Sequence, residues 1–207
     1  MLTSLLAISP SPWFQPFVWL DYRVAVLFTI IIPLVLLIWA FVQKAEHFCR
    51  LLIIYLRVAS LFVINIYLMI AALPISFISA FSVHLLIPLS LWFWIDINEE
   101  INDRASSPLK LVFTAWRWAI TVYSGIALLG QLFFLKCGFL GTPQLLEDAT
   151  CRVWLDPAWG YKEMFHSNSH VPFLGFLGLA GLLIYLLYLG YFALFRLSKS
   201  GRIAAGN

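Results

Sequence analysis

The densest group of ionisable side chains in the chain lies between Asp96 and Asp103. Its carboxylates, Asp96, Glu99, Glu100 and Asp103, stand at positions i, i+3, i+4 and i+7, the spacing that puts side chains on one face of an α-helix. Carboxylates this close repel one another, and a divalent cation or basic groups between them relieve that repulsion. The pattern indicates a metal-binding or partner-binding face. A solvated extension of a membrane helix, ending at Arg104, explains the same residues, and both interpretations stay open.

Arg57 and Arg117 form a second candidate site, because each lies six residues past the first residue of an apolar stretch, Leu51 and Leu111. At 1.5 Å per residue this is about 9 Å into the bilayer. A guanidinium at that depth either extends to the headgroups or turns inward and is paired. The functional interpretation pairs Arg57 and Arg117 with Asp96, Glu99 or Glu100, or has them contact an anionic lipid or a partner protein.

His84 lies near the middle of the third apolar stretch, with Asn65 and Thr121 on neighbouring stretches. An intramembrane histidine is commonly hydrogen-bonded to such groups and structural. It can also be an axial ligand to haem or chlorophyll, which makes His84 a cofactor-binding candidate. One histidine does not identify a cofactor, so the cofactor stays unknown.

Small residues and cysteines add two further predictions. Gly175, Gly178 and Gly181 recur every three residues in the last apolar stretch and predict a close contact with another helix, with a partner protein or with lipid. Cys137 and Cys151 fall in one loop, where a disulfide would persist if that loop faces an oxidising compartment. Two unrelated thiols are the alternative.

The elements that position these residues are membrane helices. The chain of 207 residues is 62% hydrophobic and 11% charged, which excludes an ordinary soluble domain and gives no indication of nucleic-acid binding. A span needs about 20 apolar residues, and lipid requires helices because every backbone group must be paired internally. We predict one integral membrane domain, 1–207, an all-α bundle of about five transmembrane helices. Its parts are an interfacial N-terminal segment 1–23, helices near 24–42, 51–72, 75–95, 109–135 and 172–195, and an external loop 136–171.

The distribution of Lys and Arg predicts the orientation of this bundle. Nine basic residues fall on the side of the first loop, the third loop and the C-terminus, including Lys199 and Arg202, and four fall on the other side. Cytoplasmic loops carry the excess of basic residues. We expect the N-terminus outside and the C-terminus in the cytoplasm, with Cys49 inside.

Three stretches of the sequence carry a resemblance: Trp19-Leu-Asp-Tyr-Arg23, Leu91-Trp-Phe-Trp-Ile-Asp-Ile-Asn-Glu-Glu-Ile101 and Trp116-Arg-Trp118. With them the chain resembles a family of uncharacterised integral membrane proteins from cyanobacteria, over most of its length. The resemblance implies a multi-pass protein of the thylakoid or plasma membrane. It brings no catalytic residues with it.

Taken together, these patterns favour a non-enzymatic accessory, assembly or stabilising factor for a larger membrane complex, and the resemblance implies a photosynthetic one. Its expected partners are the lipid bilayer and other membrane protein subunits. The alternative is a membrane enzyme or cofactor-binding protein that uses the 96–103 acidic face together with Arg57 and Arg117.

Overall fold

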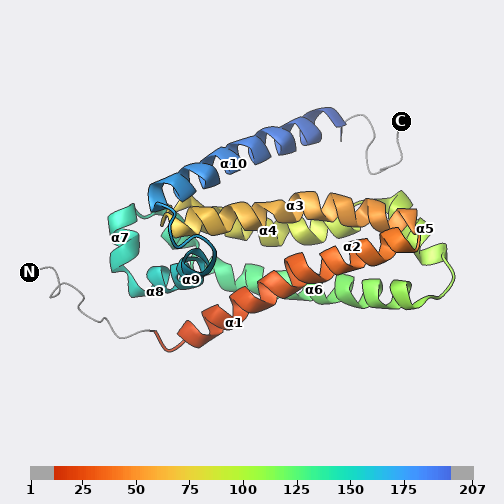
Figure 1. Ribbon diagram of the computed structural model, residues 1–207, viewed down its shortest axis with the longest axis horizontal. Helices are drawn as coiled ribbons and strands as arrows, with labels where there is room; N and C mark the ends of the chain where they lie inside the picture. Colours follow the sequence, from red (N-terminus) through yellow and green to blue (C-terminus); the bar gives the residue numbers. More distant parts are fainter. Residues whose placement is uncertain (1–11, 197–207) are drawn as a thin grey trace, which may run out of the picture.

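The computed structural model describes residues 12–196, and all regular structure in that part of the chain is helical. Five helices there are long and apolar enough to cross a membrane (Figure 1): Gln15–Val42, Glu46–Ile70, Ile75–Trp92, Pro108–Leu132 and Val171–Phe195. This confirms the predicted all-α membrane fold with five transmembrane helices. The beginning of the 1–23 segment and the basic residues Lys199 and Arg202 lie outside the described residues.

The first span is longer than predicted. It consists of α1 (Gln15–Val26), a π-helical turn (Leu27–Ile31) and α2 (Ile32–Val42), so the helix begins at Gln15 and not near residue 24. The predicted start near residue 24 left Asp21 outside the span, but its carboxylate accepts a hydrogen bond of 2.9 Å from the hydroxyl of Tyr123. A paired carboxylate can continue a membrane helix.

The π-helical turn has an identifiable cause and two compensating contacts. Pro33 lacks an N–H, so the carbonyl of Thr29 loses its helical donor. The hydroxyl of Tyr55 donates to Thr29 O at 3.0 Å, and Trp116 Nε1 donates to the neighbouring Phe28 O at 2.9 Å. Because lipid offers no hydrogen bonds, these two side chains stabilise the first span inside the bundle.

The centre of the bundle is α3 (Glu46–Ile70), which packs against α2, α4 (Ile75–Trp92) and α10 (Val171–Tyr191). α4 in turn lies against α6 (Pro108–Leu132). The acidic segment forms a separate short helix, α5 (Ile95–Asp103), because the chain is extended at Trp94. It is therefore not a continuation of the third transmembrane helix.

The predicted loop 136–171 is folded into a compact cap at the end of the bundle opposite α5 (Figure 1). Its elements are the 3-10 turns Leu135–Phe139 and Val153–Leu155 and the helices α7 (Thr142–Glu147), α8 (Ala149–Arg152) and α9 (Asp156–Phe165). Cys137 and Cys151 are bonded to each other and fully buried within it.

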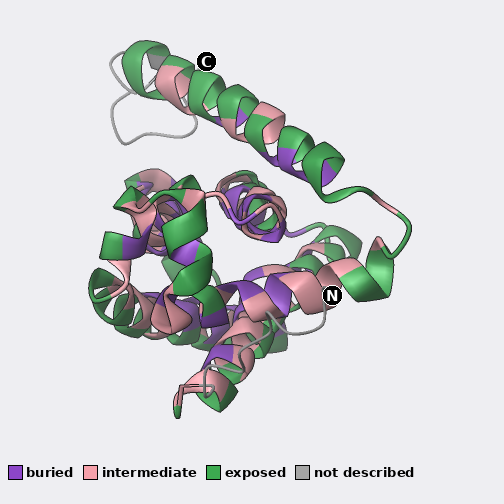
Figure 2. Ribbon diagram, turned by 90° about the vertical axis from the view of Figure 1, so that its left-hand side faces the viewer, coloured by how far each residue is buried: buried purple, intermediate pink, exposed green. Residues whose placement is uncertain are grey.

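The last span begins with α10 (Val171–Tyr191) and ends in a π-helical turn (Phe192–Arg196). It packs mainly against α3 and stands to one side of the other helices (Figure 2), with its buried residues on the side that faces the bundle. Most of its surface is exposed, so α10 is a peripheral helix.

Candidate functional site

The inner face of α10 is the glycine face predicted from the sequence, and it contacts α3 of the same chain. A Cβ atom on Gly175 would lie 2.6 Å from Ala71 Cβ, and one on Gly178 would lie 3.0 Å from the backbone nitrogen of Leu68. A Cβ atom on Gly181 would lie 3.3 Å from Cγ1 of Ile64, also in α3. Of the alternatives left open by the sequence, these glycines contact a helix of the same chain and allow the two helices to approach closely.

The outer face of α10 carries a regular row of residues that we call the α10 seam. Its members are spaced by four, three, four and three residues, the spacing of a helix–helix packing seam: Phe176, Ala180, Leu183, Leu187 and Gly190. The three large side chains are 60–66% exposed, and a Cβ atom on Gly190 would meet no atom within 4 Å. The seam therefore faces away from the protein.

A groove of about 530 Å³ lies between α3, α4 and the end of α10, next to α5. Its walls are mostly apolar and aromatic, and its lining residues are Arg50, Ile53, Ile54, Arg57, Val58, Leu86, Leu89, Ser90, Phe93, Trp94, Tyr185, Tyr188, Leu189, Phe192 and Ala193. We call it the Arg57 groove. Arg57 is exposed and donates a hydrogen bond of 3.3 Å to the hydroxyl of Tyr188. The volume of the groove falls in the range of about 300–1,000 Å³ that is typical of ligand sites.

Arg117, expected to match Arg57, has a different environment. It is only 4% exposed, its Nη1 donates to Asn98 Oδ1 at 2.5 Å, and its guanidinium lies 4.1 Å from the ring centre of Trp92. A guanidinium over an aromatic face is stabilised by the negative charge of the π system. Arg117 therefore faces the bundle interior, whereas Arg57 faces the groove, and the structure does not bring the two together in one site.

The acidic face does not form the predicted metal site. Glu99, Glu100 and Asp103 are exposed and Asp96 is half-buried. Within residues 12–196, no three His, Cys, Asp or Glu side chains lie close enough to hold one metal ion. Glu100 Oε2 instead lies 2.5 Å from Nδ1 of His47, which joins α5 to the start of α3.

His84 is buried, and its Nδ1 lies 2.9 Å from the carbonyl oxygen of Ala80 and 3.2 Å from Nε2 of Gln131. Thr121, one of the two groups expected near it, accepts a hydrogen bond from Trp92 Nε1. The neighbouring cavity, which Asn65 also lines, measures about 50 Å³. A tetrapyrrole needs a cavity of several hundred Å³, about the size of a drug-sized ligand site, so the geometry disfavours haem or chlorophyll at His84.

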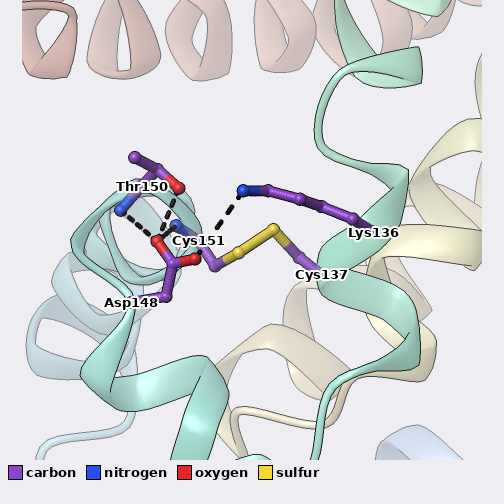
Figure 3. The surroundings of a disulfide bond; sticks show 5 residues. All are labelled: Lys136, Cys137, Asp148, Thr150 and Cys151. Atoms are coloured by element: carbon purple, nitrogen blue, oxygen red, sulfur yellow. Dashed lines mark hydrogen bonds and ion pairs between the residues drawn. A yellow bond between two sulfur atoms is a disulfide. The ribbon is translucent and has the colours of Figure 1, made fainter.

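Asp148 lies close to the disulfide and is the N-cap residue of α8, the short helix that carries Cys151 (Figure 3). Asp148 Oδ1 accepts hydrogen bonds from the hydroxyl and the backbone N–H of Thr150, at 2.5 Å and 2.8 Å. These bonds, that from the Thr150 hydroxyl first, hold the pKa of Asp148 below its ordinary value, with a smaller contribution from Lys136. The carboxylate thus caps the short helix that carries Cys151.

The fold and these surfaces define a polytopic α-helical membrane protein with a peripheral fifth helix and a groove beside it. Residues 15–205 match a family described as "Protein of unknown function (DUF3177)", and the chain belongs to that family. The predicted membership of an uncharacterised family is confirmed. No curated protein and no solved structure matches the chain.

The sequence identified Arg57 as a candidate, but not the residues that surround it in the groove. Arg50 and Arg57 stand seven residues apart, a spacing that places both on one helix face, and this signal was present. The spacing of the α10 seam could also be predicted from the sequence. The position of Tyr185 and Tyr188 beside α3 could not be predicted, because it depends on how α10 is rotated against α3.

Proposed function

We propose that this protein is a non-enzymatic accessory, assembly or stabilising factor for a larger membrane complex, and that the α10 seam contacts the partner. The observation that carries the proposal is the division of α10 into two faces. Its glycine face packs against α3 of the same chain, while the large side chains of the α10 seam on the opposite face are exposed.

The physics of helix association in lipid supports this use of the seam. Lipid tails are as apolar as leucine, so membrane helices associate through close packing rather than through burial of apolar surface. Large residues alternating with small ones provide that packing, because knobs from one helix enter holes on the other. Phe176, Leu183 and Leu187 supply knobs, and Ala180 and Gly190 leave holes.

The way α10 is attached also suits a contact helix. The close approach at Gly175 and Gly178 fixes α10 along α3, so the seam is presented in a defined orientation. A helix held in advance loses less conformational freedom when it binds. The Arg57 groove lies on another side of α10 and leaves the seam free.

The setting of this complex follows from the resemblance and the charge distribution. We place the protein in the thylakoid or plasma membrane of a cyanobacterium, with the cap in the lumen or periplasm and α5 at the cytoplasmic surface. Six of the nine basic residues assigned to the cytoplasm lie at the α5 end of α3 and α6 or in the adjoining loops, which supports this orientation.

Native sizing of gently solubilised membranes tests the proposal. We expect the protein to elute in a complex larger than its own 23.6 kDa plus detergent, together with at least one other membrane protein. The same sample in a harsher detergent should release the free chain, which serves as the size control. A protein that elutes only as a free monomer under gentle conditions would contradict the proposal.

A further inference from the structure

We propose that the Arg57 groove binds one anionic phospholipid of the surrounding bilayer, with its phosphate at Arg50 and Arg57 and an acyl chain along the apolar wall. This lipid site does not depend on the partner proposed for the α10 seam. It rests on the charges, the unsatisfied hydroxyl and the apolar wall of the groove itself.

The charges of the groove select an anion. Arg50 and Arg57 lie two helical turns apart on the same face of α3, and both are exposed and line the groove. Among the lining residues, all in the described part of the chain, none is acidic. The two positive charges are about 10 Å apart along the helix, and long arginine side chains can converge on one phosphate between them. Arginine also binds phosphate oxygens in a bidentate way, so a phosphate group fits this pair.

A tyrosine hydroxyl independently indicates that a polar group of a ligand belongs in the groove. Tyr185 lines the groove and is only 7% exposed, yet its hydroxyl has no hydrogen-bond partner among the described residues. Buried hydroxyl groups are nearly always satisfied in native proteins. An ester or phosphate oxygen of a lipid would accept this hydrogen bond.

The remaining wall matches an acyl chain. Ile53 and Val58 of α3, Leu86 and Leu89 of α4, and Leu189 and Phe192 of the last span all line the groove. The arginines and this apolar wall line the same groove, so one molecule with an anionic head and an apolar tail can contact both. Bilayer phospholipid is the molecule of this kind that surrounds the protein at high concentration.

Lipid binding to the purified full-length chain in detergent tests the site. The probe is phosphatidylglycerol, with phosphatidylcholine as the neutral lipid and inorganic phosphate as the free anion, and the readouts are native mass spectrometry and the lipid-dependent rise in Tm. We expect a single phosphatidylglycerol to remain bound, at least tenfold more tightly than phosphatidylcholine. We also expect inorganic phosphate to give no comparable rise in Tm.

Two variants and a charge-matched control distinguish a specific lipid site from nonspecific electrostatic attraction of anionic lipid to this end of the protein. Arg50→Gln with Arg57→Gln should weaken phosphatidylglycerol binding at least tenfold, whereas Lys44→Gln with Arg104→Gln, at the same end of the bundle, should change it less than twofold. Tyr185→Phe should raise Tm without lipid, because it removes an unsatisfied hydroxyl, and should reduce the lipid-dependent rise. Equal binding of both lipids, equal losses in both double variants, or an unchanged lipid response in Tyr185→Phe would each overturn the proposal.

Discussion

Gly178 lies so close to Leu68 that a Cβ atom on the glycine would stand 3.0 Å from the leucine backbone nitrogen. The contact joins the fifth transmembrane helix to α3, on which the centre of the bundle is built. It determines which face of α10 is used inside the protein and therefore which face remains for other molecules.

We expect Gly178→Ala to lower the free energy of unfolding by about 1–3 kcal/mol, because the added methyl group meets backbone that cannot move aside easily. Gly190→Ala is the matched control in the same helix. Its Cβ meets no atom within 4 Å, so the better helix propensity of alanine should leave stability unchanged or raise it by up to about 1 kcal/mol. Thermal unfolding in one detergent measures both, and equal losses would contradict the close contact.

The difference between the two intramembrane arginines predicts unequal costs of removal. Arg117→Ala leaves Asn98 Oδ1 without its donor and removes the contact with Trp92, so we expect a loss of about 3 kcal/mol. Arg57→Ala removes only an exposed hydrogen bond to Tyr188 and should cost less than about 1 kcal/mol. Denaturation of the two variants side by side measures the difference. A loss for Arg57→Ala as large as for Arg117→Ala would show that the assigned environments are wrong.

The cap should lose stability in acid because of Asp148. The folded-state pKa of this group lies below the unfolded value of about 3.9, so its contribution is present above that value and is lost as the pH falls through the folded pKa. Asp148→Asn keeps an N-cap side chain and removes only its charge, so we expect it to destabilise the protein by less than about 1 kcal/mol at pH 7 and by nothing measurable near pH 2. The exposed neighbour Glu147→Gln is the control. A difference between Asp148→Asn and wild type that stays constant with pH would contradict this assignment.

The orientation can be tested with cysteines placed at exposed positions, because the native pair is buried in a disulfide. In a Cys49→Ser background, we expect a membrane-impermeant thiol reagent to label Met164→Cys, in the cap, in intact cells. Ser106→Cys, beside α5, should be labelled only after permeabilisation. The reverse pattern would invert the assignment of the two membrane faces.

The number and type of the membrane helices could be predicted from the sequence, since hydropathy and length are local properties. The first helix shows where this fails. The predicted start near residue 24 excluded Asp21 from the helix, but the hydroxyl of Tyr123, about 100 residues away in the sequence, donates a hydrogen bond to its carboxylate. The carbonyl of Thr29, four residues before Pro33, likewise accepts a hydrogen bond from Tyr55 on another helix.

The candidate site was predicted less well, because it depends on the rotation of each helix. Arg57 and Arg117 occupy equivalent places in the sequence, yet packing turns one toward the groove and the other toward Trp92. The glycine face of α10 was recognised correctly as a contact surface. Whether it met α3 or another protein could not be decided without the three-dimensional arrangement of the helices.

The most direct test of the central claim compares two glycine substitutions in gently solubilised native complexes. Gly190→Leu fills a hole in the α10 seam, and Gly125→Leu adds the same side chain to the exposed face of α6; neither Cβ meets an atom within 4 Å in the protein itself. We predict that Gly190→Leu releases the protein from its larger complex, while Gly125→Leu elutes with the complex as wild type does. An intact complex with Gly190→Leu would contradict the assignment of the α10 seam as the surface that contacts the partner.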